Sequence, residues 1–121
     1  MTLRSFLLTA LLAPALLAVS ACHSDHIDAT IENHTSSPIQ LIEVDYPSAS
    51  FGVDALAPGA IFHYRFQIRG SGPVRIQYST SDGKQIQNTG PSLVEGQQGQ
   101  LRILLLPSGK TELDLRLTPR S

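Results

Sequence analysis

The most constraining feature of this sequence is a regular alternation of apolar and polar residues between Ala60 and Ser79. On either side of Gly70-Ser71-Gly72 every second residue is apolar, which is the period of a β-strand with one buried face. A turn at the glycines would pair each apolar residue with another: Ile68 with Val74, Phe66 with Ile76, and Tyr64 with Tyr78. Since a slip of one residue would break every pair, we predict a central antiparallel hairpin in this register.

Short alternating segments separated by turn residues continue through the rest of the chain. They cover residues 27–31, 39–46, 51–55, 101–105 and 113–117, and Ile86 can return opposite Tyr78 after a tight turn at 81–83. In the second segment the alternation shifts by one residue, which predicts a β-bulge near Leu41-Ile42. The last two segments would place Ile103 opposite Leu113, and Arg102 opposite Asp114. The weakly patterned stretch 88–100 is expected to be a surface loop.

These segments predict an all-β protein. About seven to eight short strands without any helical period are typical of an antiparallel β-sandwich, with a small closed barrel as the alternative. The pattern resembles immunoglobulin-like and fibronectin-III-like modules in architecture alone, because the inter-sheet disulfide and buried Trp of antibody domains are missing. We expect a single sandwich domain over residues 27–118.

The first residues have the composition of an export signal. Arg4 precedes an apolar run, Phe6 to Val19, of about 14 residues, which is short of the roughly 20 that a membrane-spanning helix needs. We therefore expect residues 1–21 to be a cleaved signal peptide.

The end of this segment carries a more specific motif. Val19-Ser20-Ala21-Cys22 resembles the lipobox of bacterial lipoprotein precursors, and Cys22 is the only cysteine in the chain. The resemblance implies cleavage before Cys22, acylation of that residue with palmitate-type chains, and anchoring to a membrane of the cell envelope. Residues 22–26 would be the lipidated Cys and a short tether. In enterobacterial lipoproteins His23 at the next position would favour the outer membrane.

Composition and motifs exclude several functions. A net charge of −1 argues against a nucleic-acid partner. No G-x-S-x-G elbow or nucleotide loop is present, and Glu43 with Asp45 is best explained as an ordinary outer strand face. We predict neither an enzyme nor a bound cofactor.

A metal site at the tether is the weaker alternative. His23 and His26, with Asp25 and Asp28, are ligand types, but no third or fourth ligand has diagnostic spacing. A small envelope metal carrier or enzyme that uses the tether histidines therefore stays open beside a non-catalytic binding or accessory module.

The candidate partner-binding residues lie on the polar side of the predicted hairpin. Arg65, Gln67, Arg75 and Gln77 would form one basic, amide-rich patch, and Arg presents planar donors that suit carboxylate or phosphate groups. The predicted loop at 91–100 could extend it. Leu104 and Leu106 make their strand apolar on both faces, so that strand should be interior or cover an interface. We expect an envelope protein as the partner, in addition to the membrane.

Overall fold

A computed structural model describes residues 25–119, so the predicted signal peptide, Cys22 and His23 lie outside the described residues. This part of the chain contains eight strands, one short 3-10 turn and no α-helix. The elements are β1 (His26–Asn33), β2 (Ile39–Tyr46), β3 (Ala49–Leu56), β4 (Ile61–Gln67), β5 (Gly72–Ser79), β6 (Gln85–Leu93), β7 (Gln98–Leu106), η1 (Pro107–Gly109) and β8 (Lys110–Thr118).

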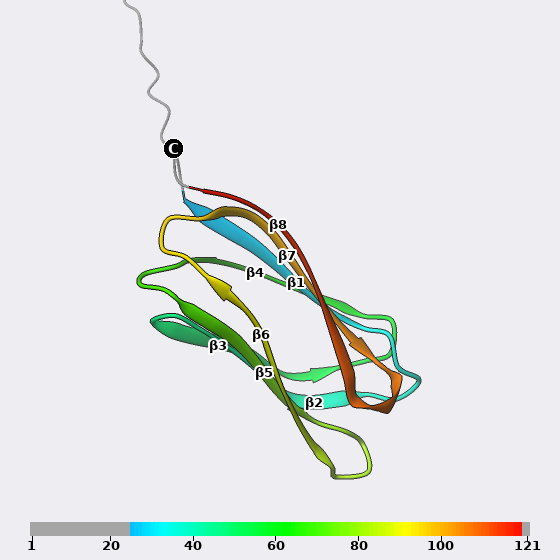
Figure 1. Cartoon of the computed structure of the whole chain (residues 1–121). Helices are drawn as coiled ribbons and strands as arrows, with labels where there is room; N and C mark the ends of the chain where they lie inside the picture. Colours follow the sequence, from blue (N-terminus) through cyan, green and yellow to red (C-terminus); the bar gives the residue numbers. More distant parts are fainter. Residues whose placement is uncertain (1–24, 120–121) are drawn as a thin grey trace, which may run out of the picture.

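The strands form two four-stranded sheets that pack face to face, in the orders β4-β1-β7-β8 and β3-β2-β5-β6 (Figure 1). Neighbouring strands are antiparallel except β1 and β7, which run parallel. The predicted all-β sandwich is confirmed. The strand order differs from that of an immunoglobulin domain, where the first two strands are neighbours in one sheet; here β1 and β2 lie in different sheets.

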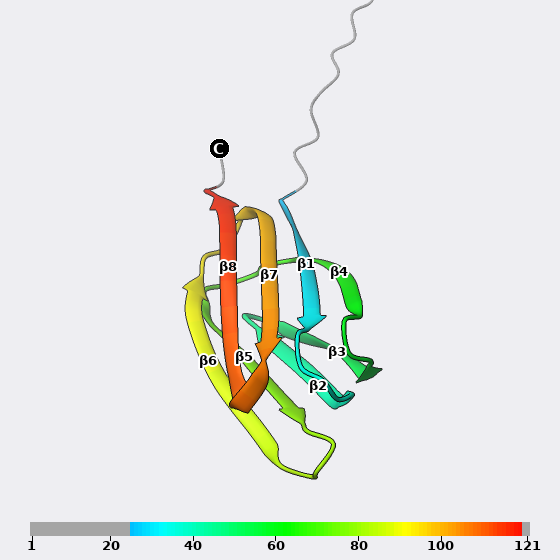
Figure 2. The same ribbon diagram turned by 90° about the vertical axis from the view of Figure 1, so that its right-hand side faces the viewer.

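Successive strands run in opposite directions, so alternate turns share an end of the sandwich. β1 begins and β8 ends at one end, as Figures 1 and 2 show. We call this the proximal end; it also carries the turns at 47–48, 68–71 and 94–97. The opposite, distal end carries the turns at 34–38, 57–60, 80–84 and 107–109.

The core fills the space between the two sheets, and side chains close both open sides. Between edge strands β3 and β4 the rings of Phe51 and Tyr64 stack with centroids 4.3 Å apart. Between edge strands β6 and β8 the side-chain amide of Asn88 donates to Thr111 Oγ1 at 2.7 Å. The sandwich is therefore sealed by aromatic stacking on one side and a polar contact on the other.

The predicted central hairpin is wrong, because β4 and β5 lie in different sheets. β4 pairs instead with β1, which aligns Phe66 with Ile27, Tyr64 with Ala29, and Phe62 with Ile31. This pairing satisfies the apolar alternation as well as the hairpin would, so the pattern cannot select between them. Ile68 is 3% exposed and follows directly on β4, so the connection is fixed in the core as it crosses between the sheets.

The predicted bulge in the second strand is confirmed. The β2–β5 register shifts between Gln40 and Glu43, and Leu41 has a φ of 52° with its side chain exposed. The strand opposite approaches closely here: a Cβ added to Gly52 would lie 2.5 Å from the carbonyl oxygen of Ile42. Glycine is therefore required at position 52 for the two backbones to pack.

The stretch 88–100 is mostly strand, so the surface-loop prediction is wrong. β6 runs to Leu93, which is fully buried, and β7 starts at Gln98, leaving a tight turn closed by the Gln97 N–H on the Val94 carbonyl at 3.1 Å. The strand was not predicted because it contains Gly90 and Pro91, and both residue types are uncommon in strands. Both residues are tolerated because β6 is an edge strand.

The remaining registers agree with prediction. Tyr78 lies opposite Ile86, across the turn at 80–84. β7 and β8 align Ile103 with Leu113, and Arg102 with Asp114. β7 is an interior strand, as its apolar character on both faces indicated, with Leu104 and Leu106 half-buried.

Candidate binding surface on the outer sheet face

The four predicted partner-binding residues do not form one patch. Arg65 and Gln67 lie on β4, and Arg75 and Gln77 lie on β5, in the opposite sheet. The two pairs therefore face solvent on opposite sides of the sandwich. Their outward orientation is as predicted, and their juxtaposition is not, because it depended on the hairpin.

Arg75 and Gln77 lie on an outer face where carboxylates of β2 adjoin side-chain amides of β5 and β6. Arg75 lies opposite Asp45, and Gln77 donates to Glu43 Oε1 at 3.4 Å and accepts from the side-chain amide of Gln87 at 3.1 Å. Hydrogen bonding with Asp45, together with repulsion between the two carboxylates, raises the pKa of Glu43. The basic character expected at Arg75 is thus offset by acidic neighbours.

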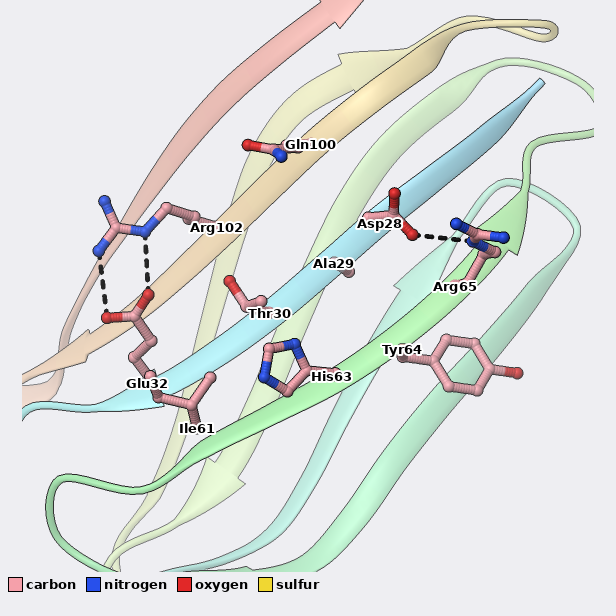
Figure 3. A pocket seen from close by; sticks show the side chains of 10 residues that line it. All are labelled: Asp28, Ala29, Thr30, Glu32, Ile61, His63, Tyr64, Arg65, Gln100 and Arg102. Atoms are coloured by element: carbon pink, nitrogen blue, oxygen red, sulfur yellow. Dashed lines mark hydrogen bonds and ion pairs between the residues drawn. The ribbon is translucent and has the colours of Figure 1, made fainter. Parts of the chain in front are cut away.

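On β4, Arg65 borders a hollow in the outer face of the β4-β1-β7-β8 sheet. Here the outer face is hollowed by about 710 Å³, over the strands β4, β1 and β7 (Figure 3). We call this the outer hollow and define it by six of its lining residues: Asp28, Thr30, Glu32, His63, Arg65 and Arg102. Ile61, which is 51% exposed, adds apolar surface to its rim.

One side of the outer hollow is bounded by an exposed ion pair. Arg65 Nε donates to Asp28 Oδ1 at 2.8 Å, and both side chains are more than half exposed. The contact joins directly opposed residues of β4 and β1. An exposed pair of this kind adds little stability, so its charges can be redirected to a ligand at small cost.

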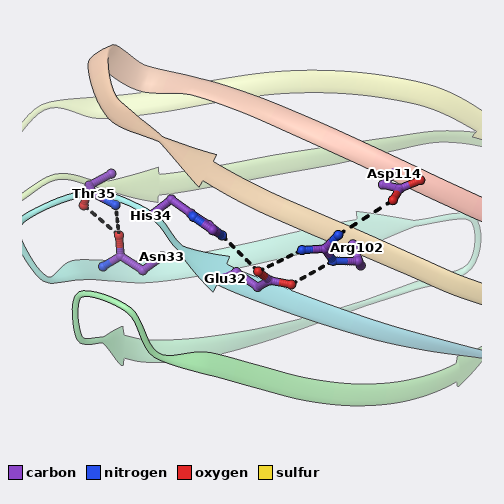
Figure 4. Close-up of polar contacts among 6 residues, drawn as sticks. All are labelled: Glu32, Asn33, His34, Thr35, Arg102 and Asp114. Atoms are coloured by element: carbon purple, nitrogen blue, oxygen red, sulfur yellow. Dashed lines mark hydrogen bonds and ion pairs between the residues drawn. The ribbon is translucent and has the colours of Figure 1, made fainter.

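The other side is bounded by a more buried carboxylate. Glu32, only 13% exposed, accepts from Arg102 Nε at 2.9 Å and Nη2 at 3.1 Å, and its Oε1 lies 2.9 Å from His34 Nε2 (Figure 4). Hydrogen bonds from Arg102 and then from His34 lower the pKa of Glu32 from its ordinary 4.5 to about 2, against the opposing effect of burial. Arg102 Nη1 also lies 3.8 Å from Asp114 on β8.

Thr30 and His63 lie between these two ion pairs (Figure 3). The Thr30 hydroxyl is buried and has no hydrogen-bond partner in the part of the chain that the structure describes. Its cross-strand neighbours are His63 on β4 and Arg102 on β7. His63 is exposed beside the buried hydroxyl of Thr30.

Sequence reasoning missed most of the outer hollow. The alternation in β1 places Asp28, Thr30 and Glu32 on one face, and that signal was available. The alternation does not predict which strands flank β1, because β4 and β7 are distant from it in sequence.

The outer hollow carries charges of both signs. Its two cations and two carboxylates are paired, and the Thr30 hydroxyl has no hydrogen-bonded base among residues 25–119. Over the same residues no group of three or more His, Cys, Asp or Glu side chains is placed to hold a metal ion. The alternative metal site includes His23, which lies outside the described residues, and stays a prediction.

Comparisons with known proteins bear on the fold alone. No protein family and no curated protein matches the sequence. The solution structure of a protein from Eubacterium rectale is similar, with a TM-score of 0.55 and 13% identity, over 80% of this chain and 91% of that one. Within residues 25–119 no helix is long and apolar enough to cross a membrane.

Proposed function

We propose that this protein is a lipid-anchored lipoprotein of the bacterial envelope whose domain is a non-catalytic binding module. The support for anchoring is the coincidence of a lipobox-like sequence with the only cysteine of the chain, at Cys22. Several acyl chains on one residue give stable membrane attachment, which a single chain does not.

The observation that carries the binding role is the outer hollow. It combines guanidinium and carboxylate groups, an exposed Ile61 and a Thr30 hydroxyl without a partner among residues 25–119, all on one sheet face. Such a set suits an envelope protein segment that presents charges of both signs and some apolar surface, since each charged group can exchange its present partner for one on the ligand.

A matched pair of charge reversals tests this role. Arg65 and Arg75 are both exposed, and each lies opposite an aspartate on the neighbouring strand, but only Arg65 borders the outer hollow. In cross-linking on native membranes, Arg65→Glu should lose an envelope partner that the wild type and Arg75→Glu both retain. Retention of every partner by Arg65→Glu would overturn the proposal, provided that thermal unfolding shows both variants folded.

A further inference from the structure

The position of the predicted anchor relative to the sandwich constrains how the domain can lie on a membrane. Only residues 23–25 separate Cys22 from the first residue of β1, His26. Four Cα-to-Cα steps span at most about 14 Å when fully extended. This reach is shorter than β1 itself, which extends roughly 25 Å over its eight residues at about 3.3 Å each.

The proximal end is therefore the part of the domain that an anchored chain holds against the bilayer. It carries the turns at 68–71 and 94–97, which are joined by hydrogen bonds. The Gly70 N–H donates to Glu95 Oε1 at 2.7 Å, and the Glu95 N–H donates to Ser71 Oγ at 3.4 Å. Two adjoining turns thus form one fixed surface rather than independent loops.

That surface presents an apolar side chain to its surroundings. The large hydrophobic side chains that are exposed over residues 25–119 are Leu41, Ile61, Tyr64 and Val94, and among these Val94 alone lies at the proximal end. Its backbone is held in place, since the Val94 N–H donates to Gln97 Oε1 at 2.8 Å. Arg69, also exposed, lies on the neighbouring turn.

We propose that the proximal end rests on the lipid surface, with Val94 in the headgroup region and Arg69 beside it. The inference rests on the proposed anchoring at Cys22. The contact is apolar rather than electrostatic, because the charge of Arg69 is offset by Asp25 and Glu95 at the same end. The distal end then stands roughly 25 Å above the headgroups, and the outer hollow opens sideways along β1, where a partner can reach it.

Single introduced cysteines test this orientation on the full lipidated protein. In the lipidated chain Cys22 is a thioether, so Val94→Cys, Arg69→Cys or Ser81→Cys supplies the only free thiol for a nitroxide label. Ser81 is exposed on the distal end and serves as the control. The protein is reconstituted into vesicles of phosphatidylethanolamine and phosphatidylglycerol, and collision with oxygen is compared with collision with a water-soluble nickel chelate.

Labels at positions 94 and 69 should collide severalfold less with the nickel chelate than the label at 81, and more with oxygen. Flotation of the same vesicles tests the anchoring separately from the orientation. Protein that floats with the vesicles but shows equal accessibility at all three positions overturns the orientation and leaves the anchoring intact. Protein that does not float overturns the anchoring, and the orientation with it.

Discussion

The Thr30 hydroxyl on β1 is buried without a hydrogen-bond partner in the described chain, as are His26 Nδ1 and the Tyr78 hydroxyl. Leaving such a group unsatisfied typically costs about 1–3 kcal/mol of stability. Such a group is open to a hydrogen bond from a water molecule or a ligand.

Replacing Thr30 with valine tests this interpretation. Valine keeps the branched shape that suits a central strand and removes the unsatisfied oxygen, so Thr30→Val should raise the free energy of unfolding by about 1 kcal/mol. Urea denaturation provides the measurement, and Thr30→Ser, which keeps a hydroxyl, is the control. If Thr30→Val is less stable than the wild type, the hydroxyl has a partner in the folded state.

Glu32 predicts a pH dependence of stability. Its pKa is about 2 in the folded protein and near the ordinary 4.5 in the unfolded chain. The stabilisation is therefore complete above about pH 4.5 and is lost as the pH falls towards 2, because the unfolded chain takes up the proton first. Glu32→Gln should be less stable at pH 7 and show a flatter decline between pH 4.5 and 2.

Denaturation midpoints measured across this range check the Glu32 prediction. Glu112→Gln, at an exposed glutamate on β8, is the matched control and should follow the wild-type curve. Parallel curves for the wild type and Glu32→Gln would show that the contacts from Arg102 and His34 do not persist in solution.

For individual side chains, the sequence predicts orientation well and spatial neighbours poorly. Period-2 alternation correctly placed Arg65, Gln67, Arg75 and Gln77 on outer faces, since successive side chains of a strand point to opposite faces. Whether two such residues share a face depends on which strands pair, and alternation carries no information on that.

Strands β2 and β3 show which irregularities of a strand the sequence can predict. The phase shift at Leu41 was visible in the sequence and corresponds to the observed bulge. The consequence for Gly52 was not visible, because it arises from the backbone of Ile42 on the neighbouring strand.

Two glycine-to-alanine substitutions distinguish a steric clash at position 52 from the general effect on stability of replacing a glycine. Gly52→Ala should lower the free energy of unfolding by about 1–3 kcal/mol, since the new Cβ would meet the Ile42 carbonyl oxygen. Gly72→Ala is the control, because its Cβ would lie at an ordinary 3.7 Å from Pro47 Cγ. Chemical denaturation of both variants makes the comparison, and equal losses would contradict a crowded site at 52.

Strand pairing was predictable where the turn was short and its partner was the next strand. The pairings of β5 with β6 and of β7 with β8 were both correct, because a tight turn leaves few alternatives. The turn between β4 and β5 is also short, yet the chain changes sheets there. Burial of Ile68 and the apolar match between β4 and β1 favour the crossing, and both are tertiary effects.

For the molecule as a whole, anchoring is tested at Cys22. Cys22→Ala should leave the precursor unprocessed or release the protein from membranes, because the acceptor of the lipid is lost. Intact-mass measurement of the wild type should show a chain that starts at Cys22 with added acyl mass. A mature N-terminus elsewhere, without lipid, would contradict the proposal.

The parallel pairing of β1 with β7 has a consequence for the order in which the protein assembles. β2 with β3, and β5 with β6, can form as local hairpins early, but β1 aligns Ile27 with Gly99 and cannot complete its sheet until most of the chain is available. Contacts this far apart in sequence form slowly because the loop they close is long. β1 can pair with β4 once residues 61–67 are present, but its other edge stays open until β7 has been synthesised, so the sheet that holds β1 is completed late.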